Sequence, residues 1–391
     1  MISCRTDRDS SVSFFFSVSC RWRFFPFRVT FFDKNTIFAT VMGKKNKIIS
    51  VFFVAMAVAC FIVVAMGYHF VLSPIVKVEK ASTLKLYADE SVDEVTAKVQ
   101  SASGSDIRGF RWLTAVNACR SRQPQTDYHP FQAGSYVVKA GDSMRDIWNR
   151  LASGNQTAVN VVVGSPRTLD RLAGTLGKQL MADSLAFITA FSNDTLVKAL
   201  GYDADTLPAL FLPNTYQFYW TITPEAFLDR MKKEHEIFWN DQRLSLAQAQ
   251  GLTPTEVATL ASIVDEETNK NDEKPIVAGL YLNRLRLGIP LQADPTVKYA
   301  VGDATLRRIL YAHLDVDSPY NTYKYIGLPP GPIRIASMRG IDAVLHATKH
   351  SYLYMCARED FSGYHNFATT LADHNANARR YQAALNLRGI K

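Results

Sequence analysis

A long uncharged segment constrains the fold of this chain most. Residues 48–72 contain no Asp, Glu, Lys or Arg, and the run exceeds the ~20 residues that an α-helix needs to cross a bilayer. Lys44, Lys45 and Lys47 lie directly before it. By the positive-inside rule, the long C-terminal part then lies outside the cytoplasm. The sequence therefore predicts a short cytoplasmic tail at residues 42–47, a single transmembrane helix at 48–72 in the inner (plasma) membrane, and a periplasmic or otherwise extracytoplasmic remainder.

A cleaved signal peptide is the alternative interpretation of this segment. A signal peptide has a shorter apolar region, followed by a cleavage site of the small-x-small type. The length of the run and the apolar residues that continue to its end favour an uncleaved anchor.

The first 41 residues follow no folding pattern. Phe-rich pieces alternate with Arg, and neither a helical nor a strand period continues through them. We expect translation to begin at Met42, with residues 1–41 a mis-annotated extension. A disordered extension is the alternative.

The formal net charge of +8 is concentrated at the N-terminus. Residues 1–47 carry nine Lys or Arg and three Asp, so the rest of the chain has an excess of only about +2. This distribution argues against a nucleic-acid partner and fits charge that flanks a membrane segment. The five cysteines include no CxxC pair, so we expect no metal and no other cofactor.

Residues 75–160 are expected to form a small α/β subdomain. The segment AGSYVVKAGDSMRDIWNRLASG predicts a strand at 135–138, a Gly-Asp turn, and a helix with apolar residues at 3.6-residue spacing. This strand, turn and helix resemble a LysM module, a small fold that binds glycans containing N-acetylglucosamine. A plain packing subdomain is the alternative. Strands and helices mix in residues 161–391, so the predicted fold class is α+β.

A helix with a well-specified start is predicted at residues 253–267. Thr253 is a good N-cap, Pro254 occupies the favoured first helical position, and Glu256 closes a capping box. Apolar residues at i, i+3, i+4 and i+7 then form one stripe along the helix.

Three consecutive acids end this helix, and helical geometry separates their side chains. At 100° per residue, Glu266 falls opposite the apolar stripe, whereas Glu267 lies along its edge. We expect Glu266 to be solvated. We expect Glu267 to be partly buried, where desolvation raises the pKa of a carboxyl group toward the value that a general acid needs. The alternative is an acidic helix end with all three carboxylates, including Asp265, in water.

Five segments carry a resemblance to a known family. In chain order they are LASIVDEET, AGLYLNRLRLGIPLQADPTVKYAVG, SPYNTYKYIGLPPGPI, SYLYMCA and HNFATTLADHN. Together they resemble the motifs of the YceG-like endolytic murein transglycosylases. The resemblance covers most of residues 42–391 and is strongest over 260–375. It implies that residues 161–391 form a mixed α+β catalytic domain of the YceG-like type.

The resemblance also implies the site residues. The catalytic glutamate of the family directly precedes a threonine, which corresponds to Glu267 before Thr268. Asp265 replaces a Glu that is common in the family, which argues against Asp265 as the essential acid. The motifs further supply side chains expected to bind substrate, namely Thr268, Glu273, Asn283, Gln292, Asp294, Thr296, Tyr299, Tyr320, Asn321 and Tyr323. A structural role such as turn-capping is the alternative for each.

The activity implied by the resemblance is that of a peptidoglycan lytic transglycosylase, a lyase. Such an enzyme cleaves the MurNAc–GlcNAc β-1,4 bond within nascent glycan strands, leaves 1,6-anhydro-MurNAc ends and terminates strand elongation. Its expected partners are peptidoglycan strands and peptidoglycan synthases. Two alternatives remain: a muramidase-type hydrolase with Glu273 or Asp294 as the second carboxylate, and a membrane-anchored glycan-binding scaffold without activity.

Overall fold

A computed structural model describes residues 44–121, 128–302, 306 and 309–389. The expected extension at residues 1–41 and the expected start at Met42 lie outside the described residues. The chain divides into two compact units, the first reaching Asn155 and the second beginning at Gln156, with the short stretch Ala133–Ser135 also belonging to the second.

A helix is present where the sequence predicts the membrane span. Helix α1 (Lys44–Gly67) continues into a short π-helix, η1 (Tyr68–Leu72). The segment Ser50–Leu72 is long and apolar enough to cross a membrane. Its residues from Ser50 to Gly67 are exposed, with Phe61 exposing 73% of its surface, whereas Val71 in η1 is buried. An apolar helix with exposed side chains on every side suits a lipid environment.

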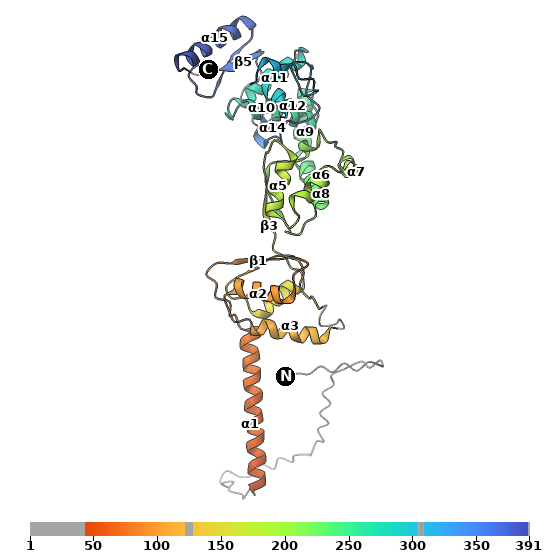
Figure 1. Cartoon of the computed structure of the whole chain (residues 1–391), viewed down its shortest axis with the longest axis vertical. Coiled ribbons are helices and arrows are strands. Elements are labelled where there is room, and N and C mark those ends of the chain that lie inside the picture. The colour runs from red at the N-terminus through yellow and green to blue at the C-terminus, as the bar shows by residue number, and fades with distance from the viewer. Residues whose placement is uncertain (1–43, 122–127, 303–305, 307–308, 390–391) are drawn as a thin grey trace. The chain divides into compact units, whose positions relative to one another are not determined.

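After η1, the first unit contains a two-stranded sheet and helices, of which Figure 1 labels α2 and α3. Its elements are β1 (Ser82–Leu86), α2 (Val92–Ser103), α3 (Arg108–Arg120), β2 (Gly134–Val138) and α4 (Met144–Ala152). Strands β1 and β2 pair, and Phe110, Tyr136 and Ile147 lie in the apolar core. The predicted strand, turn and helix are thus confirmed as β2, the turn after it, and α4.

A buried carboxylate holds the turn between β2 and α4. Asp142 accepts a hydrogen bond from the Lys139 amide at 3.0 Å and pairs with the Arg150 guanidinium at 2.9 Å. Ser143 and Asp146 then form a capping box that starts α4. These local contacts therefore explain the turn after β2 and the start of α4.

The second unit contains two antiparallel strand pairs among many helices. Strand β3 (Val159–Val163) pairs with β4 (Asn214–Phe218), and β5 (Tyr354–Ala357) pairs with β6 (His365–Ala368). The described helices are α5 (Leu169–Gln179), α6 (Ser184–Phe191), α7 (Asp194–Ala199), the 3₁₀-helix η3 (Leu207–Leu210), α8 (Pro224–Phe238), α9 (Asp241–Gln250), α10 (Pro254–Glu267), α11 (Lys274–Arg286), α12 (Asp294–Val301), α13 (Tyr311–Leu314), α14 (Met338–Leu345) and α15 (Leu371–Leu387).

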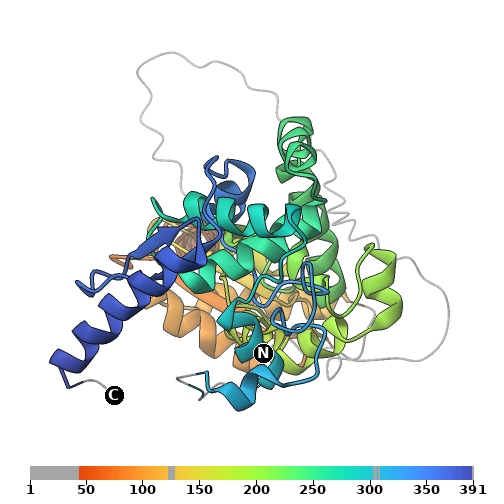
Figure 2. The same ribbon diagram turned by 90° about the horizontal axis from the view of Figure 1, so that it is seen from above.

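Two apolar cores stabilise this unit. One joins β3 and β4 to α5, α6 and α8 through residues such as Leu172, Phe187 and Phe227. The other joins α9, α10, α11 and α14 through residues such as Leu260 and Val344. Figure 1 shows these groups of helices, and Figure 2 shows α15 beside the β5–β6 pair that it contacts.

Helix α10 lies at the centre of the second core. The predicted capping box of Thr253 and Glu256 is confirmed. The predicted single apolar stripe is too narrow, because residues 257–265 are all buried. Polar positions are satisfied inside the core: Ser262 accepts a hydrogen bond from the Ile333 amide at 3.0 Å. The surrounding helices therefore fix the position of α10 on several sides, up to its last residue.

Candidate active site

Glu267 is the last residue of α10, at the point where the chain leaves the helix. Thr268 has an extended backbone, with φ −142° and ψ 139°, and its amide still donates to the Val264 carbonyl. The Thr268 hydroxyl accepts a hydrogen bond from the Lys270 amide at 3.1 Å, which stabilises the turn. The helix end therefore presents Glu267 to a cavity of about 330 Å³.

Four residues predicted from the sequence line this cavity. They are Glu267, Gln292, Asp294 and Tyr323. They come from the end of α10, the segment before α12, the start of α12, and the segment before α14. Residues separated widely in the chain are thus brought to one cavity.

The carboxyl group of Glu267 is desolvated and has no cation to neutralise it. The Tyr281 hydroxyl donates to Glu267 Oε1 at 2.7 Å, and among the described residues Glu267 forms no ion pair with Lys, Arg or His. The pKa of Glu267 is raised to about 7. Burial is the main cause; the Tyr281 hydrogen bond lowers the pKa, and the nearby charges of Asp294 and Glu266 raise it. At neutral pH this group is therefore able both to donate and to accept a proton.

Tyr281 remains a neutral phenol in this environment. Its side chain is buried, and burial together with the charge of Glu267 raises the pKa of Tyr281 well above its usual value. The phenol therefore donates its proton in the hydrogen bond and fixes the orientation of the Glu267 carboxyl group.

Arg284 forms hydrogen bonds to three residues around the cavity. Its guanidinium donates to the Pro290 carbonyl at 2.9 Å, the Leu353 carbonyl at 2.7 Å and Gln292 Oε1 at 2.6 Å. Gln292 has a backbone φ of 51°, a left-handed conformation that is costly for a residue other than glycine. The contacts of Arg284 therefore help to hold Gln292 in a strained conformation at the cavity.

Asp294 and Tyr323 form a second polar pair in the same cavity. The Tyr323 hydroxyl donates to Asp294 Oδ1 at 2.6 Å. Burial and the hydrogen bond to Asp294 raise the pKa of Tyr323 well above its usual value. Asp294 is solvent-exposed, in contrast to Glu267.

The other predicted binding residues do not line this cavity. Glu273 is buried and accepts hydrogen bonds from the amide and Nδ1 of His365, at 2.7 and 3.0 Å. Asn283 donates to the His350 carbonyl at 2.8 Å. These contacts join α11 to the segments that lead into the β5–β6 pair.

Further predicted residues stabilise the segments around α12. Thr296 shares a hydrogen bond of 2.8 Å with Thr322, and Asn321 donates to two carbonyl groups in the preceding loop. The Tyr299 ring packs on the Tyr320 ring with centroids 4.7 Å apart, and Tyr299 lines a different cavity.

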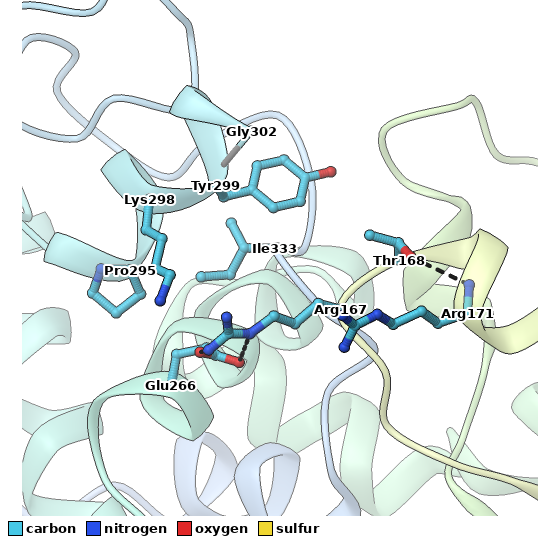
Figure 3. Close-up of a pocket in the computed structure, with 9 residues that line it drawn as sticks. All are labelled: Arg167, Thr168, Arg171, Glu266, Pro295, Lys298, Tyr299, Gly302 and Ile333. Atoms are coloured by element: carbon cyan, nitrogen blue, oxygen red, sulfur yellow. Dashed lines mark hydrogen bonds and ion pairs between the residues drawn. The ribbon is translucent and has the colours of Figure 1, made fainter. Parts of the chain in front are cut away.

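The prediction that Glu266 is solvated is wrong. Only 10% of its side chain is exposed, and its carboxylate forms ion pairs with Arg167 and Arg334. The two arginines lie 99 and 68 residues away in the sequence. Figure 3 shows the pair of Arg167 with Glu266. Helical geometry correctly predicted that the two glutamate side chains point in different directions. It could not predict these partners, which come from distant segments.

The sequence analysis did not name the other residues that line the cavity as binding residues. Among them are Tyr281, Arg284, Tyr354, His365 and His374. A signal for two of them was present, because Tyr281 and Arg284 lie three residues apart and therefore share one face of α11.

Among the described residues, no group of three His, Cys, Asp or Glu side chains is arranged to hold a metal ion.

Comparisons with known proteins match most of the chain. The sequence profile of the YceG-like family matches residues 84–380. A Bacillus subtilis (strain 168) protein named endolytic murein transglycosylase is 28% identical over 320 residues, which cover 76% of this chain and 88% of that protein. A Streptococcus pneumoniae (strain R6) protein of the same name is 28% identical over 290 residues, and the match spans 51% of its length.

A solved structure is also similar. The crystal structure of a YceG-like protein from Listeria monocytogenes superposes with a TM-score of 0.51 at 25% identity. The superposition covers 76% of this chain and 99% of the Listeria chain.

Proposed function

The chain belongs to the YceG-like family, and from this premise we propose that it is an endolytic lytic transglycosylase of peptidoglycan. It cleaves the MurNAc–GlcNAc β-1,4 bond within nascent strands, leaves 1,6-anhydro-MurNAc ends and so terminates elongation. The names of the relatives support the reaction class. The observation that carries the proposal is the pKa of Glu267, raised to about 7 by burial in a cavity.

Glu267 acts first as the acid and then as the base. Its protonated form gives a proton to the glycosidic oxygen, and the bond between this oxygen and C1 of MurNAc breaks. The C6 hydroxyl of the same MurNAc attacks C1, and its proton passes to the Glu267 carboxylate. The acid is thereby restored, and no water is consumed. General acid–base catalysis by one group works best when its pKa lies near the working pH.

Tyr281 acts as a positioning residue for this chemistry. Its hydrogen bond engages Glu267 Oε1, whereas Oε2 has no hydrogen-bond partner among the described residues. Oε2 is therefore the oxygen that faces the substrate. Gln292, Asp294 and Tyr323 supply hydrogen-bonding groups for the sugar hydroxyls in the same cavity.

A muramidase-type hydrolase is the second candidate, and Asp294 is the observation that favours it. Hydrolysis normally requires two carboxylates in one site, and Asp294 lies in the cavity with Glu267. Glu273 is less suited to this role, because its carboxylate is buried against His365 outside the cavity. The two reactions differ in whether water enters the product.

The proposal also includes anchoring in the plasma membrane with both units outside the cytoplasm. The apolar segment Ser50–Leu72 and the lysines before it support this orientation. Protease added to spheroplasts should then digest the two units. Protection from protease, or release of the protein by a salt wash, would contradict it.

We further propose that residues 75–160 form a LysM-like subdomain and that residues 161–391 form the catalytic domain. The β2–turn–α4 arrangement supports the first assignment. A sugar-binding subdomain would hold strands near the synthases that extend them, which are the proposed membrane partners. Binding of N-acetylglucosamine oligomers to the first unit, followed by NMR or calorimetry, tests this assignment, and absence of binding would favour a plain packing role.

The experiment that tests the proposed activity is digestion of purified peptidoglycan by the full chain in detergent. The wild type should shorten long glycan strands from internal positions, and Glu267→Gln should not. Intact strands after incubation with the wild type would instead favour a binding scaffold.

A further inference from the structure

A second cavity lies on the Glu266 side of α10. Its volume is about 570 Å³. One wall comes from the segment that leads into α5 and from the first turn of that helix, and the opposite wall comes from α12 (Figure 3). The cavity is therefore formed by elements of the second unit alone.

Two cations in this cavity lack a counter-ion. The charge of Glu266 is already balanced by Arg167 and Arg334. Arg171 and Lys298 also line the cavity, and neither forms an ion pair with any residue that the structure describes. Figure 3 shows them on opposite walls, Arg171 on α5 and Lys298 on α12. The cavity therefore offers two separated positive charges to an anionic ligand.

Apolar surface also lines this cavity. Tyr299, Ile333 and Pro295 contribute it, and the Tyr299 ring is held in place by its contact with Tyr320. A compact phosphate would leave the apolar surface empty. An elongated ligand with separated carboxylates and small apolar side chains fits the charges and the walls together.

The second cavity and the candidate active site share two structural elements. Glu266 and Glu267 are consecutive on α10, and Asp294 and Pro295 are consecutive at the start of α12. In each pair one residue lines one cavity and its neighbour lines the other. Consecutive Cα atoms lie about 3.8 Å apart. The two cavities therefore lie beside each other at the end of α10 and the start of α12.

We infer that the second cavity binds the stem peptide carried by the MurNAc residue at the cleaved bond, with Arg171 and Lys298 pairing with its carboxylates. This inference rests on the proposed function, because it takes the ligand from the same substrate. Peptidoglycan carries on each MurNAc lactyl group a short peptide with free carboxylates and alanine methyl groups, which is the chemistry that the cavity presents. The cavity would then make the enzyme prefer strands that retain their peptides.

The test compares two substrates in the full chain: glycan strands with stem peptides, and the same strands after removal of the peptides by an amidase. The wild type should have a lower KM for strands with peptides. In the double variant Arg171→Gln/Lys298→Gln, the ratio of the two KM values should fall toward one, a change of about tenfold for two charged contacts at a partly exposed site. Lys178→Gln, on the same helix α5 but outside the cavity, is the matched control and should keep the wild-type ratio.

Competition identifies the ligand. Free stem tetrapeptide should inhibit the wild type more strongly than it inhibits the double variant. Inorganic pyrophosphate that inhibits more strongly than the peptide, through the same two residues, would overturn the assignment to a peptide.

Two further outcomes separate the inference from the proposed function. An unchanged KM ratio in the double variant would overturn the inference alone. Cleavage of both substrates by Glu267→Gln would instead overturn the proposed function, whatever the ratio.

Discussion

The environments of Glu266 and Glu267 differ completely, although the residues are adjacent. Glu266 is paired with two arginines from distant segments. Glu267 meets a neutral tyrosine, and burial raises its pKa to about 7. Successive residues of a helix point about 100° apart, so one turn of α10 serves two cavities. The comparison teaches that the partners of a carboxylate, and not its position in an acidic run, decide its chemistry.

Asp265 extends this comparison. It accepts hydrogen bonds from Lys274 Nζ at 2.5 Å and from the amide and hydroxyl of Ser337, at 2.6 and 2.8 Å. A Cβ atom on Gly340 would lie 2.6 Å from its Oδ1, so the carboxylate also packs closely against α14. Three consecutive acids therefore serve three purposes: Asp265 joins helices, Glu266 binds arginines and Glu267 is the proposed acid.

The largest expected effect is on catalysis. Glu267→Gln should lower the rate of strand cleavage by at least about 10²–10⁴-fold, the usual contribution of general acid–base catalysis, because an amide cannot protonate the leaving oxygen. Glu266→Gln is the matched control. Its rate of strand cleavage should stay within about tenfold of the wild-type rate, well short of the loss in Glu267→Gln. Single-turnover cleavage of purified strands measures both. An inactive Glu266 variant beside an active Glu267 variant would reverse the assignment of the two residues.

The next effect is on folding. Asp265→Asn should lower the free energy of unfolding by about 3–5 kcal/mol, because it leaves the buried Lys274 without its counter-charge. Urea denaturation of the full chain in detergent measures this difference. A loss below about 1 kcal/mol, as for an exposed ion pair, would mean that the pair is solvated.

Glu267→Gln should also change how stability depends on pH. The pKa of Glu267 is higher in the folded protein, about 7, than its usual value near 4.5. The folded state therefore binds the proton more tightly, and the stabilisation that Glu267 contributes should be lost as pH rises from about 4.5 to 7. Because Gln does not titrate, the variant should become more stable than the wild type across this range, by on the order of 1–3 kcal/mol. Parallel curves for the two proteins would contradict the raised pKa.

Glu266→Gln should have a smaller effect on stability. It leaves Arg167 and Arg334 without their shared carboxylate, and the side chain of Arg167 is 45% exposed. We expect the free energy of unfolding to fall by about 1–2 kcal/mol, between the values for surface and buried pairs. Because surface pairs are screened by salt, the difference from wild type should shrink at high ionic strength.

The smallest expected effect is a shift of the pH profile. The acid form of Glu267 is needed first, so kcat/KM should fall as pH rises past about 7. Tyr281→Phe removes a hydrogen bond that lowers the pKa of Glu267, so this fall should move to higher pH. A shift to lower pH would show that the tyrosine stabilises the protonated form instead.

Local chemistry made parts of the fold and site predictable from the sequence. The capping box of Thr253 and Glu256 fixes where α10 begins, and a fixed start sets the direction of every later side chain. The burial of Glu267 followed from that register. The ion pairs of Glu266 did not, because they depend on how α10 packs against distant segments, and no periodic pattern encodes such contacts. The contacts of Arg284 could not be predicted for the same reason, although its position on one face of α11 with Tyr281 could, since its partners include carbonyl groups of loops.

The most direct test of the single-acid mechanism is the mass of the products formed in water labelled with oxygen-18. The full chain should release glycan fragments that end in 1,6-anhydro-MurNAc, lighter by one water than reducing ends and free of the label, because the C6 hydroxyl displaces the leaving group. Fragments with reducing ends that carry the label would show that water attacks C1. In that case the reaction would be hydrolysis, with water in place of the C6 hydroxyl and Asp294 as the second carboxylate.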